Sequence, residues 1–148
     1  MISEKLIEDM KAAMKSGDKV RLGVIRMLRA ELKNAQIAAR EALSAEDEEK
    51  VLFAYAKKRR ESMDQYVEGG RKDLANREEA EYEITMAYLP PRMEAEELTS
   101  LIQAKISETG ARGGGAFGTV MKAVMQEAGS RVDGSMVSTR VREMLNGD

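Results

Sequence analysis

The sequence predicts an all-α fold, and three of its properties favour helices over strands. Apolar residues recur every three or four positions, as they do on the buried face of a helix, and they do not alternate as they do in a strand. Aromatic residues make up only 4% of the 148 residues, so the core must consist mainly of aliphatic side chains and Met. The two prolines are adjacent, at Pro90 and Pro91, and leave long stretches of chain that no proline interrupts.

The residues before the two prolines are expected to form a bundle of four helices. Ser3, Asp18 and Ser44 are candidate N-caps of the first three helices, and the third helix should stop at Gly69-Gly70. The expected helices cover residues 3–16, 19–40, 44–68 and 71–88. The expected apolar stripe of the second helix consists of Val20, Val24, Leu28, Leu32 and Ala35.

The residues after the prolines are expected to form three shorter helices. Gly110 and Gly129 each end a helix, and Asp133 can cap the last one. The expected helices cover residues 94–109, 116–128 and 133–146, and a glycine-rich segment joins the first two. The sequence therefore predicts two units, a helical bundle over residues 1–89 and a small three-helix domain over residues 92–148.

Composition narrows the classes of function. No run of about 18 apolar residues is present, and the N-terminus lacks the apolar region of a secretory signal. These features predict a cytoplasmic protein that does not bind membranes. The chain contains neither Cys nor His, so the commonest nucleophiles, general bases and metal ligands are missing. We therefore expect no catalytic residue, no metal and no cofactor.

Charged residues interrupt the apolar faces of the third and fourth predicted helices. Arg59 lies within the first of these faces, and Glu78 and Glu81 lie within the second. Because a glycine turn joins the two helices, they should pack antiparallel and bring the three charges together. A cation and two carboxylates in a dry site could be catalytic, but no nucleophile or metal-ligand set accompanies them. We interpret them as a structural ion pair that fixes the register of the helices.

The last third of the chain carries a local excess of positive charge, although the net charge is -2. Between Lys105 and Arg142 there are six basic residues and three acidic ones. One interpretation is an ordinary solvated surface, and the other is a surface that binds phosphate groups. The glycine-rich segment 110–118 is not a phosphate loop of the GK[ST] type, but Gly118 opens a helix whose N-terminal amides attract phosphate.

Several short motifs, taken together, resemble the GatB/YqeY family. They are ESM at 61–63, GGRKDLANREEAEYEI at 69–84, YLP at 88–90, GTVMKAVM at 118–125 and RVDG at 131–134. The resemblance covers essentially the whole chain. It implies an all-α protein whose small C-terminal domain is shared with the tail of GatB, a component of glutamyl/aspartyl-tRNA amidotransferase, where the tail contacts tRNA. That enzyme is a carbon–nitrogen ligase with glutamine as amido donor, and no segment of this chain matches its active sites.

The resemblance implies a tRNA-associated binding module with no active site of its own. It makes tRNA and proteins of aminoacylation or transamidation the candidate partners. Other interpretations stay open: a helical adaptor that binds protein only, an accessory of the ligase, and a small enzyme that uses Arg59, Glu78 and Glu81. If the tail binds RNA, its basic side chains should contact phosphates. The candidates, in order, are Lys122, Arg131, Arg112 and Arg140.

Overall fold

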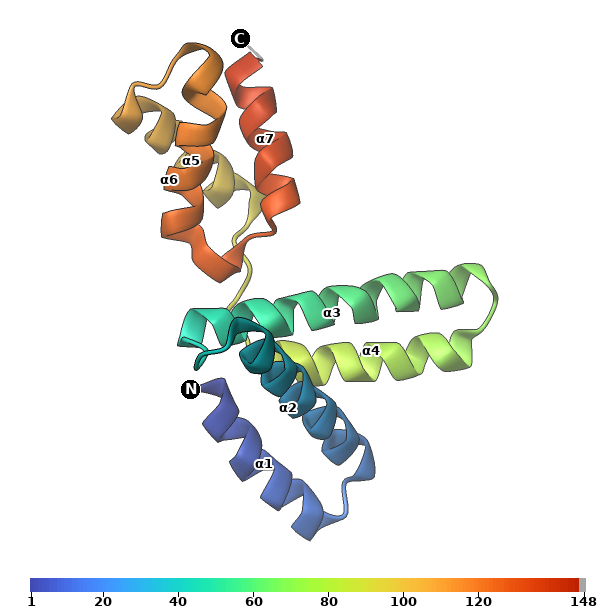
Figure 1. Cartoon of the computed structure of the whole chain (residues 1–148). Helices are drawn as coiled ribbons and strands as arrows, with labels where there is room; N and C mark the ends of the chain where they lie inside the picture. Colours follow the sequence, from blue (N-terminus) through green and yellow to red (C-terminus); the bar gives the residue numbers. More distant parts are fainter. Residues whose placement is uncertain (147–148) are drawn as a thin grey trace. The chain divides into compact units, whose positions relative to one another are not determined.

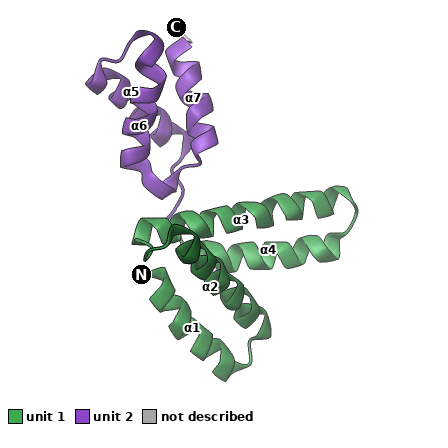
Figure 2. Cartoon of the chain, in the orientation of Figure 1, with its two compact units in different colours: residues 1–89 green, residues 90–148 purple. Residues whose placement is uncertain are grey.

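The computed structural model describes residues 1–146, which form α-helices and two short 3₁₀ helices and include no strand. The predicted all-α fold class is confirmed. The chain divides into two compact units, Met1–Leu89 and Pro90–Asp148 (Figures 1 and 2). Over the described range, none of the helices has both the length and the apolar character needed to cross a membrane.

The first unit consists of two helical hairpins that point in different directions (Figure 1). The first hairpin contains α1 (Ile2–Ser16) and α2 (Lys19–Ala39), and the second contains α3 (Ala45–Glu68) and α4 (Lys72–Met86). The hairpins share one core, which removes their apolar stripes from water. Its buried members are Leu6, Ala13, Val24, Ile25, Leu28, Leu32, Leu52 and Tyr55.

The helix starts of the first unit follow the sequence with one exception. The predicted N-caps Asp18 and Ser44 each accept a hydrogen bond from the amide three residues later. The prediction for Ser3 is wrong, because α1 begins at Ile2 and Ser3 lies inside its first turn. The Ser3 amide donates to the Glu48 carboxylate at 3.3 Å. A buried acid from α3 thus pairs with a first-turn amide that has no intrahelical partner.

The α2 helix does not bury the whole of its predicted apolar stripe. Val24, Leu28 and Leu32 are buried as expected, but Val20 is 63% exposed. The stripe therefore reaches the core only from the second turn of the helix onward. The α4 helix also ends at Met86, before the predicted boundary, because the chain turns ahead of the two prolines.

The second unit packs three helices around a single core. These are α5 (Ala95–Thr109), α6 (Ala116–Ala128) and α7 (Gly134–Asn146). Short 3₁₀ helices at Gly113–Gly115 and Gly129–Arg131 lie directly before and after α6. The buried members of the core are Leu98, Leu101, Ile102, Val120, Val124, Ala128, Val137 and Val141. Each helix contributes one apolar stripe, so the charged side chains of the unit lie on its outer surface.

Candidate functional sites

The structure brings Arg59 of α3 together with Glu78 and Glu81 of α4. The Arg59 Nη1 atom lies 3.4 Å from Glu78 Oε2 and 3.7 Å from Glu81 Oε2. The guanidinium carbon of Arg59 also lies 4.9 Å from the centre of the Tyr55 ring, within the range of a cation–π contact. The three charged side chains are between 15% and 26% exposed, so the cluster lies at the edge of the core.

Burial disfavours the charged form of Glu78, the least exposed member of this cluster. It raises the pKa of the Glu78 carboxyl above its usual range, although the Arg59 guanidinium opposes the change. Arg59 Nε and Glu78 Oε2 are both buried without a well-directed hydrogen bond. The contacts are therefore Coulombic and do not form a bidentate fork. Pairs of this kind contribute little net stability, but the loss of one partner is costly.

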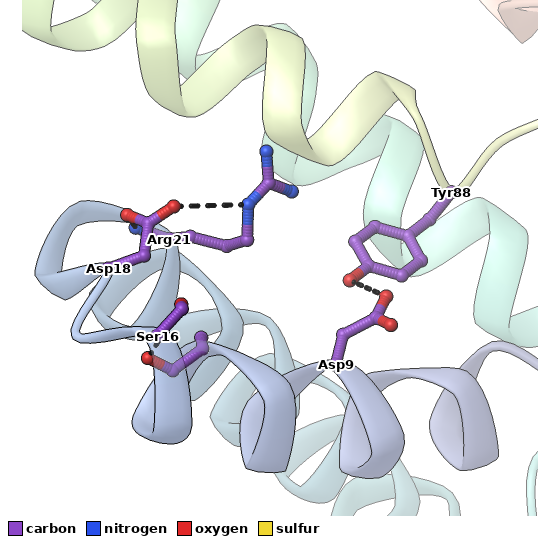
Figure 3. Close-up of polar contacts among 6 residues, drawn as sticks. Asp9, Ser16, Asp18, Arg21 and Tyr88 are labelled. Atoms are coloured by element: carbon purple, nitrogen blue, oxygen red, sulfur yellow. Dashed lines mark hydrogen bonds and ion pairs between the residues drawn. The ribbon is translucent and has the colours of Figure 1, made fainter.

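A second polar contact joins α1 to the end of the first unit. The Tyr88 hydroxyl donates to Asp9 Oδ2 at 2.5 Å, as Figure 3 shows. The Lys5 ammonium lies 3.4 Å from the other Asp9 oxygen. With Arg21, these side chains line a surface pocket of about 380 Å³. The hydrogen bond from Tyr88 lowers the pKa of Asp9, and burial raises the pKa of Tyr88.

Replacing Tyr88 by Phe should lower the free energy of unfolding by about 1 to 2 kcal/mol, because it removes a hydrogen bond to a charged acceptor at a partly exposed site. The lowered pKa of Asp9 means that its ionised form stabilises the fold above the ordinary value of 3.8. That stability is lost as the pH falls through the lowered pKa. In thermal denaturation, Tyr88→Phe should therefore lose less stability than the parent between about pH 5 and pH 2. An identical acid dependence in both proteins would contradict the assigned bond.

Two of the four residues predicted to contact RNA are exposed basic side chains that form no ion pair within residues 1–146. Lys122 lies on the face of α6 opposite its buried stripe, and Arg112 precedes the glycine turn before that helix. Both side chains are exposed, and neither has an ion-pair partner within residues 1–146. They can meet a phosphate without breaking a contact inside the chain.

The other two predicted contacts have acidic partners. Arg131 donates to both carboxylate oxygens of Glu97, at 3.3 and 3.2 Å, and to the carbonyl of Pro91 at 3.2 Å. Arg140 Nη1 lies 3.0 Å from Glu143 Oε2. Arg131 therefore ties the segment before α5 to the turn after α6. Either arginine would have to share its acid with an incoming phosphate.

A surface pocket of about 630 Å³ lies at the start of α6, with Arg112 in its lining. Arg142 of α7 lines the same pocket, and its guanidinium carbon lies 4.9 Å from the centre of the Phe117 ring. None of the described lining residues is acidic. Sequence analysis missed Arg142 as a contact. In the sequence, Arg142 is only one of the six basic residues between Lys105 and Arg142. Its position near Arg112 depends on the packing of α7 against α6, which the sequence does not show.

The glycine-rich turn leaves the backbone at the start of α6 uncovered. Gly113 has a φ of +79°, which favours glycine, and this accounts for one of the three consecutive glycines. A side chain at Gly114, Gly115 or Gly118 would meet no atom within 4 Å. The Ala116 amide at the start of α6 already donates to the Gly113 carbonyl, and the remaining amides of a first helical turn lack intrahelical partners and attract anions. Two arginines beside such a turn form an arrangement that can bind phosphate oxygens.

Comparison with known proteins places this chain among relatives. A family model described as Yqey-like protein matches residues 3–145. "Altered inheritance of mitochondria protein 41, mitochondrial" of Pyrenophora tritici-repentis (strain Pt-1C-BFP) is 26% identical over 150 residues, which cover 98% of this chain and 81% of that protein. Its namesake from Eremothecium gossypii is 34% identical over 108 residues, which cover 70% of this chain and 58% of that protein. Both names place those relatives in mitochondria, and the cytoplasmic location expected from this sequence stays a prediction.

Proposed function

This chain belongs to the Yqey-like protein family, and we propose that it is a tRNA-associated binding module without an active site of its own. The observation that carries the proposal is the pair of arginines, Arg112 and Arg142, that lines one pocket beside the exposed start of α6. The motifs that resemble the GatB tail lie at residues 118–125 and 131–134, in the same unit. The module would work alongside proteins of aminoacylation or transamidation, and any part in carbon–nitrogen ligation would be accessory.

The chemistry of this surface suits phosphate better than bases. Guanidinium groups donate forked hydrogen bonds to phosphate oxygens, and a helix N-terminus adds a favourable dipole. Lys122, on the exposed side of the same helix, extends the positive surface. Recognition of single-stranded bases needs exposed rings for stacking, and only 4% of residues are aromatic. The proposed contact therefore follows the shape and backbone of folded RNA.

The two arginines that already form ion pairs are expected to contribute less to RNA affinity than the cations that form none in the described part of the chain. Because Arg131 and Arg140 already have acidic partners, their expected contribution to RNA affinity is smaller than that of Arg112, Lys122 and Arg142. The order of candidates is therefore Arg112, Arg142 and Lys122 first, with Arg131 and Arg140 after them.

The test is a titration of folded tRNA with the full chain and its variants at low salt. The triple variant Arg112→Ala, Lys122→Ala, Arg142→Ala should bind about ten- to a hundredfold more weakly, because exposed charge pairs contribute up to about 1 kcal/mol each. Circular dichroism should show an unchanged helix content, because Arg112 and Lys122 are exposed and Arg142 contributes only a surface ring contact.

A matched control removes the same charge from the first unit. Lys11→Ala, Lys15→Ala, Lys58→Ala changes three exposed lysines that have no ion-pair partner in the described chain. This control should bind tRNA with less than about a threefold change, since its lysines lie in the first unit, which carries none of the proposed phosphate contacts. Equal weakening by both triple variants would show that binding is nonspecific. A chain that ignores tRNA at low salt but binds a protein of the transamidation machinery would be the adaptor.

A further inference from the structure

One face of α2 is apolar, exposed and regularly spaced. Val20, Met27 and Ile37 on this face are 63%, 50% and 64% exposed. The positions between them that share the face are also exposed and follow the alternating three- and four-residue spacing of a coiled-coil seam. This α2 seam consists of Val20, Gly23, Met27, Ala30, Asn34 and Ile37.

The α2 seam is separate from the stripe that joins this helix to the core. The buried residues of α2 are Val24, Ile25, Leu28 and Leu32. At 100° per residue their mean direction is turned well away from that of the seam, and Val24 lies beside Val20 where the two faces meet. A surface helix needs one apolar stripe to pack against its own unit. A second, exposed stripe therefore indicates a second contact.

Gly23 is the least expected member of the seam. It lies in the interior of a helix of 21 residues, where glycine is less stable than alanine. A side chain at Gly23 would meet no atom within 4 Å, so no contact inside this chain requires its absence. An isolated glycine inside a helix is tolerated but costs about 1 kcal/mol relative to alanine. Close approach of a second backbone at this point would supply a reason for the glycine.

A row of basic residues follows one edge of the α2 seam. Lys19, Arg26, Lys33 and Arg40 recur every seven residues, and all four are exposed. None of them has an ion-pair partner within residues 1–146. Seven residues correspond to two helical turns, so Lys19, Arg26 and Lys33 are spaced about 10.5 Å apart along the axis of α2. Arg40 is the C-cap, with a φ of +59°, and lies just beyond the helix. At the end of the seam, Ile37 lines a surface hollow of about 300 Å³ together with Lys33, Arg40 and the acidic Glu41.

We propose that the α2 seam is a docking surface for an acidic amphipathic helix of another protein. An apolar stripe on the partner would cover the seam, and acidic residues with seven-residue spacing would meet the basic row. Charge complementarity selects such a partner, because no residue of the row forms an ion pair within residues 1–146, although Glu41 lies close to the Arg40 end of the row. The seam from Val20 to Ile37 is about 26 Å long, which is four to five turns of a partner helix.

A second copy of this chain fits the seam less well. In an antiparallel pair the two basic rows would face each other, and like charges across a seam are destabilising. In a parallel pair, Arg26 opposite Glu31 is the one favourable cross-pair that the edges offer. RNA also fits less well, since a phosphate backbone rewards the cations but leaves Val20 and Met27 against a polar surface. The docking surface lies in the first unit, so it stands independently of the proposed tRNA contact in the second.

The test uses the full chain and a pair of synthetic helical peptides of about 21 residues, a length that matches α2. Both peptides carry Leu at the seam-facing positions; one carries Glu and the other Lys at the flanking positions. In fluorescence anisotropy titrations the Glu peptide should bind at least about tenfold more tightly than the Lys peptide. Equal affinities, or no binding of the Glu peptide, would overturn the proposal.

Charge reversal on the seam edge gives the sharper comparison. Arg26→Glu, Lys33→Glu should invert the preference so that the Lys peptide binds better. The matched control Lys11→Glu, Lys15→Glu makes the same change in net charge on α1 and should keep the preference for the Glu peptide. Inversion by both double variants, or by neither, would show that the edge of the seam does not select the partner.

Substitutions at Gly23 test the docking surface in variants that are expected to keep the fold. Gly23→Ala should raise the melting temperature of the full chain by about 2 to 6 °C, because alanine favours the helix and meets no clash. Gly23→Leu should fold as well as the parent and weaken the Glu peptide by about tenfold or more, because the backbones can no longer approach closely. Unchanged binding by Gly23→Leu would overturn the docking surface.

Two further outcomes would reassign the seam. Sedimentation could show that the parent chain dimerises and that Gly23→Leu abolishes the dimer, which would assign the seam to a second copy. Alternatively, Arg26→Glu, Lys33→Glu could abolish tRNA binding while the triple variant Arg112→Ala, Lys122→Ala, Arg142→Ala retains it. That result would assign the basic row to RNA and overturn both proposals, whereas loss of tRNA binding in the triple variant alone leaves the docking proposal intact.

Discussion

Replacing Arg59 by Met should lower the free energy of unfolding of the first unit by about 2 to 3 kcal/mol. Removing one partner of a buried pair costs about 3 to 5 kcal/mol, and the figure is smaller here because the Arg59 side chain is 26% exposed. Glu78 and Glu81 would face each other without a cation, and Tyr55 would lose its cation–π contact. Urea denaturation measured on the full chain would report the change.

The neighbouring residue provides a matched control. Arg60 pairs with Asp64 at 3.9 Å, and both side chains are more than half exposed. Arg60→Met should therefore change stability by no more than about 0.5 kcal/mol. An Arg59→Met protein as stable as Arg60→Met would show that Arg59 is an ordinary surface residue. Loss of an enzymatic activity without loss of stability would favour the small enzyme that uses the Arg59 cluster.

Replacing Glu78, the acidic partner of Arg59, should affect stability differently. The raised pKa of Glu78 means that folding favours its protonated form, so its contribution is present below the ordinary value of 4.5 and is lost as the pH rises through the raised pKa. Glu78→Gln should therefore be neutral or slightly stabilising at pH 7, with Glu81 left to pair with Arg59. A loss as large as that of Arg59→Met would contradict the raised pKa.

Replacing Leu28 by Ala should destabilise the first unit by about 3 to 4 kcal/mol. The side chain is fully buried, and its truncation leaves a cavity in addition to the lost transfer free energy. The two core clusters share no residue, so we expect this variant to lower only the unfolding transition of the first unit. Ile102→Ala, equally buried in the second cluster, should lower only the other transition.

Calorimetry of the two variants would separate these effects. Each should shift one of two transitions by roughly 10 °C or more, given that about 1 kcal/mol moves a domain of this size by about 4 to 8 °C. A single transition that moves in both variants would contradict independent units. The domain boundaries predicted at residues 89 and 92 would then describe structure but not folding.

Most of the fold could be predicted from local sequence signals, because helices are encoded by local spacing. Periodic apolar residues and the glycines or prolines between them located the helices that the structure contains. The predictions were wrong where contacts with residues far away in the sequence determine a helix start or the burial of a side chain. Ser3 is not a cap because α1 begins one residue earlier, at Ile2, and the amide of Ser3 pairs with Glu48 of another helix. Val20 continues an apolar spacing that periodicity alone cannot divide between a core and an exposed face.

The candidate sites were less predictable for the same reason. Arg59, Glu78 and Glu81 could be placed together because a short turn joins their helices, so sequence distance from the turn sets their register. The basic residues of the tail could be counted from the sequence, but the sequence does not show which of them form ion pairs. Arg131 meets Glu97 through tertiary packing, and no local pattern reports that contact.

The central claim is that the second unit binds tRNA through phosphate contacts of Arg112, Lys122 and Arg142. The most direct measurement is the association constant of the full chain with folded tRNA over a series of salt concentrations. Each phosphate contact contributes about -0.9 to the slope of the log–log plot in duplex geometry. Three contacts predict a slope of about -2 to -3, which the triple alanine variant should bring close to zero. No binding at about 50 mM salt, or a slope that the triple variant leaves unchanged, would contradict the account.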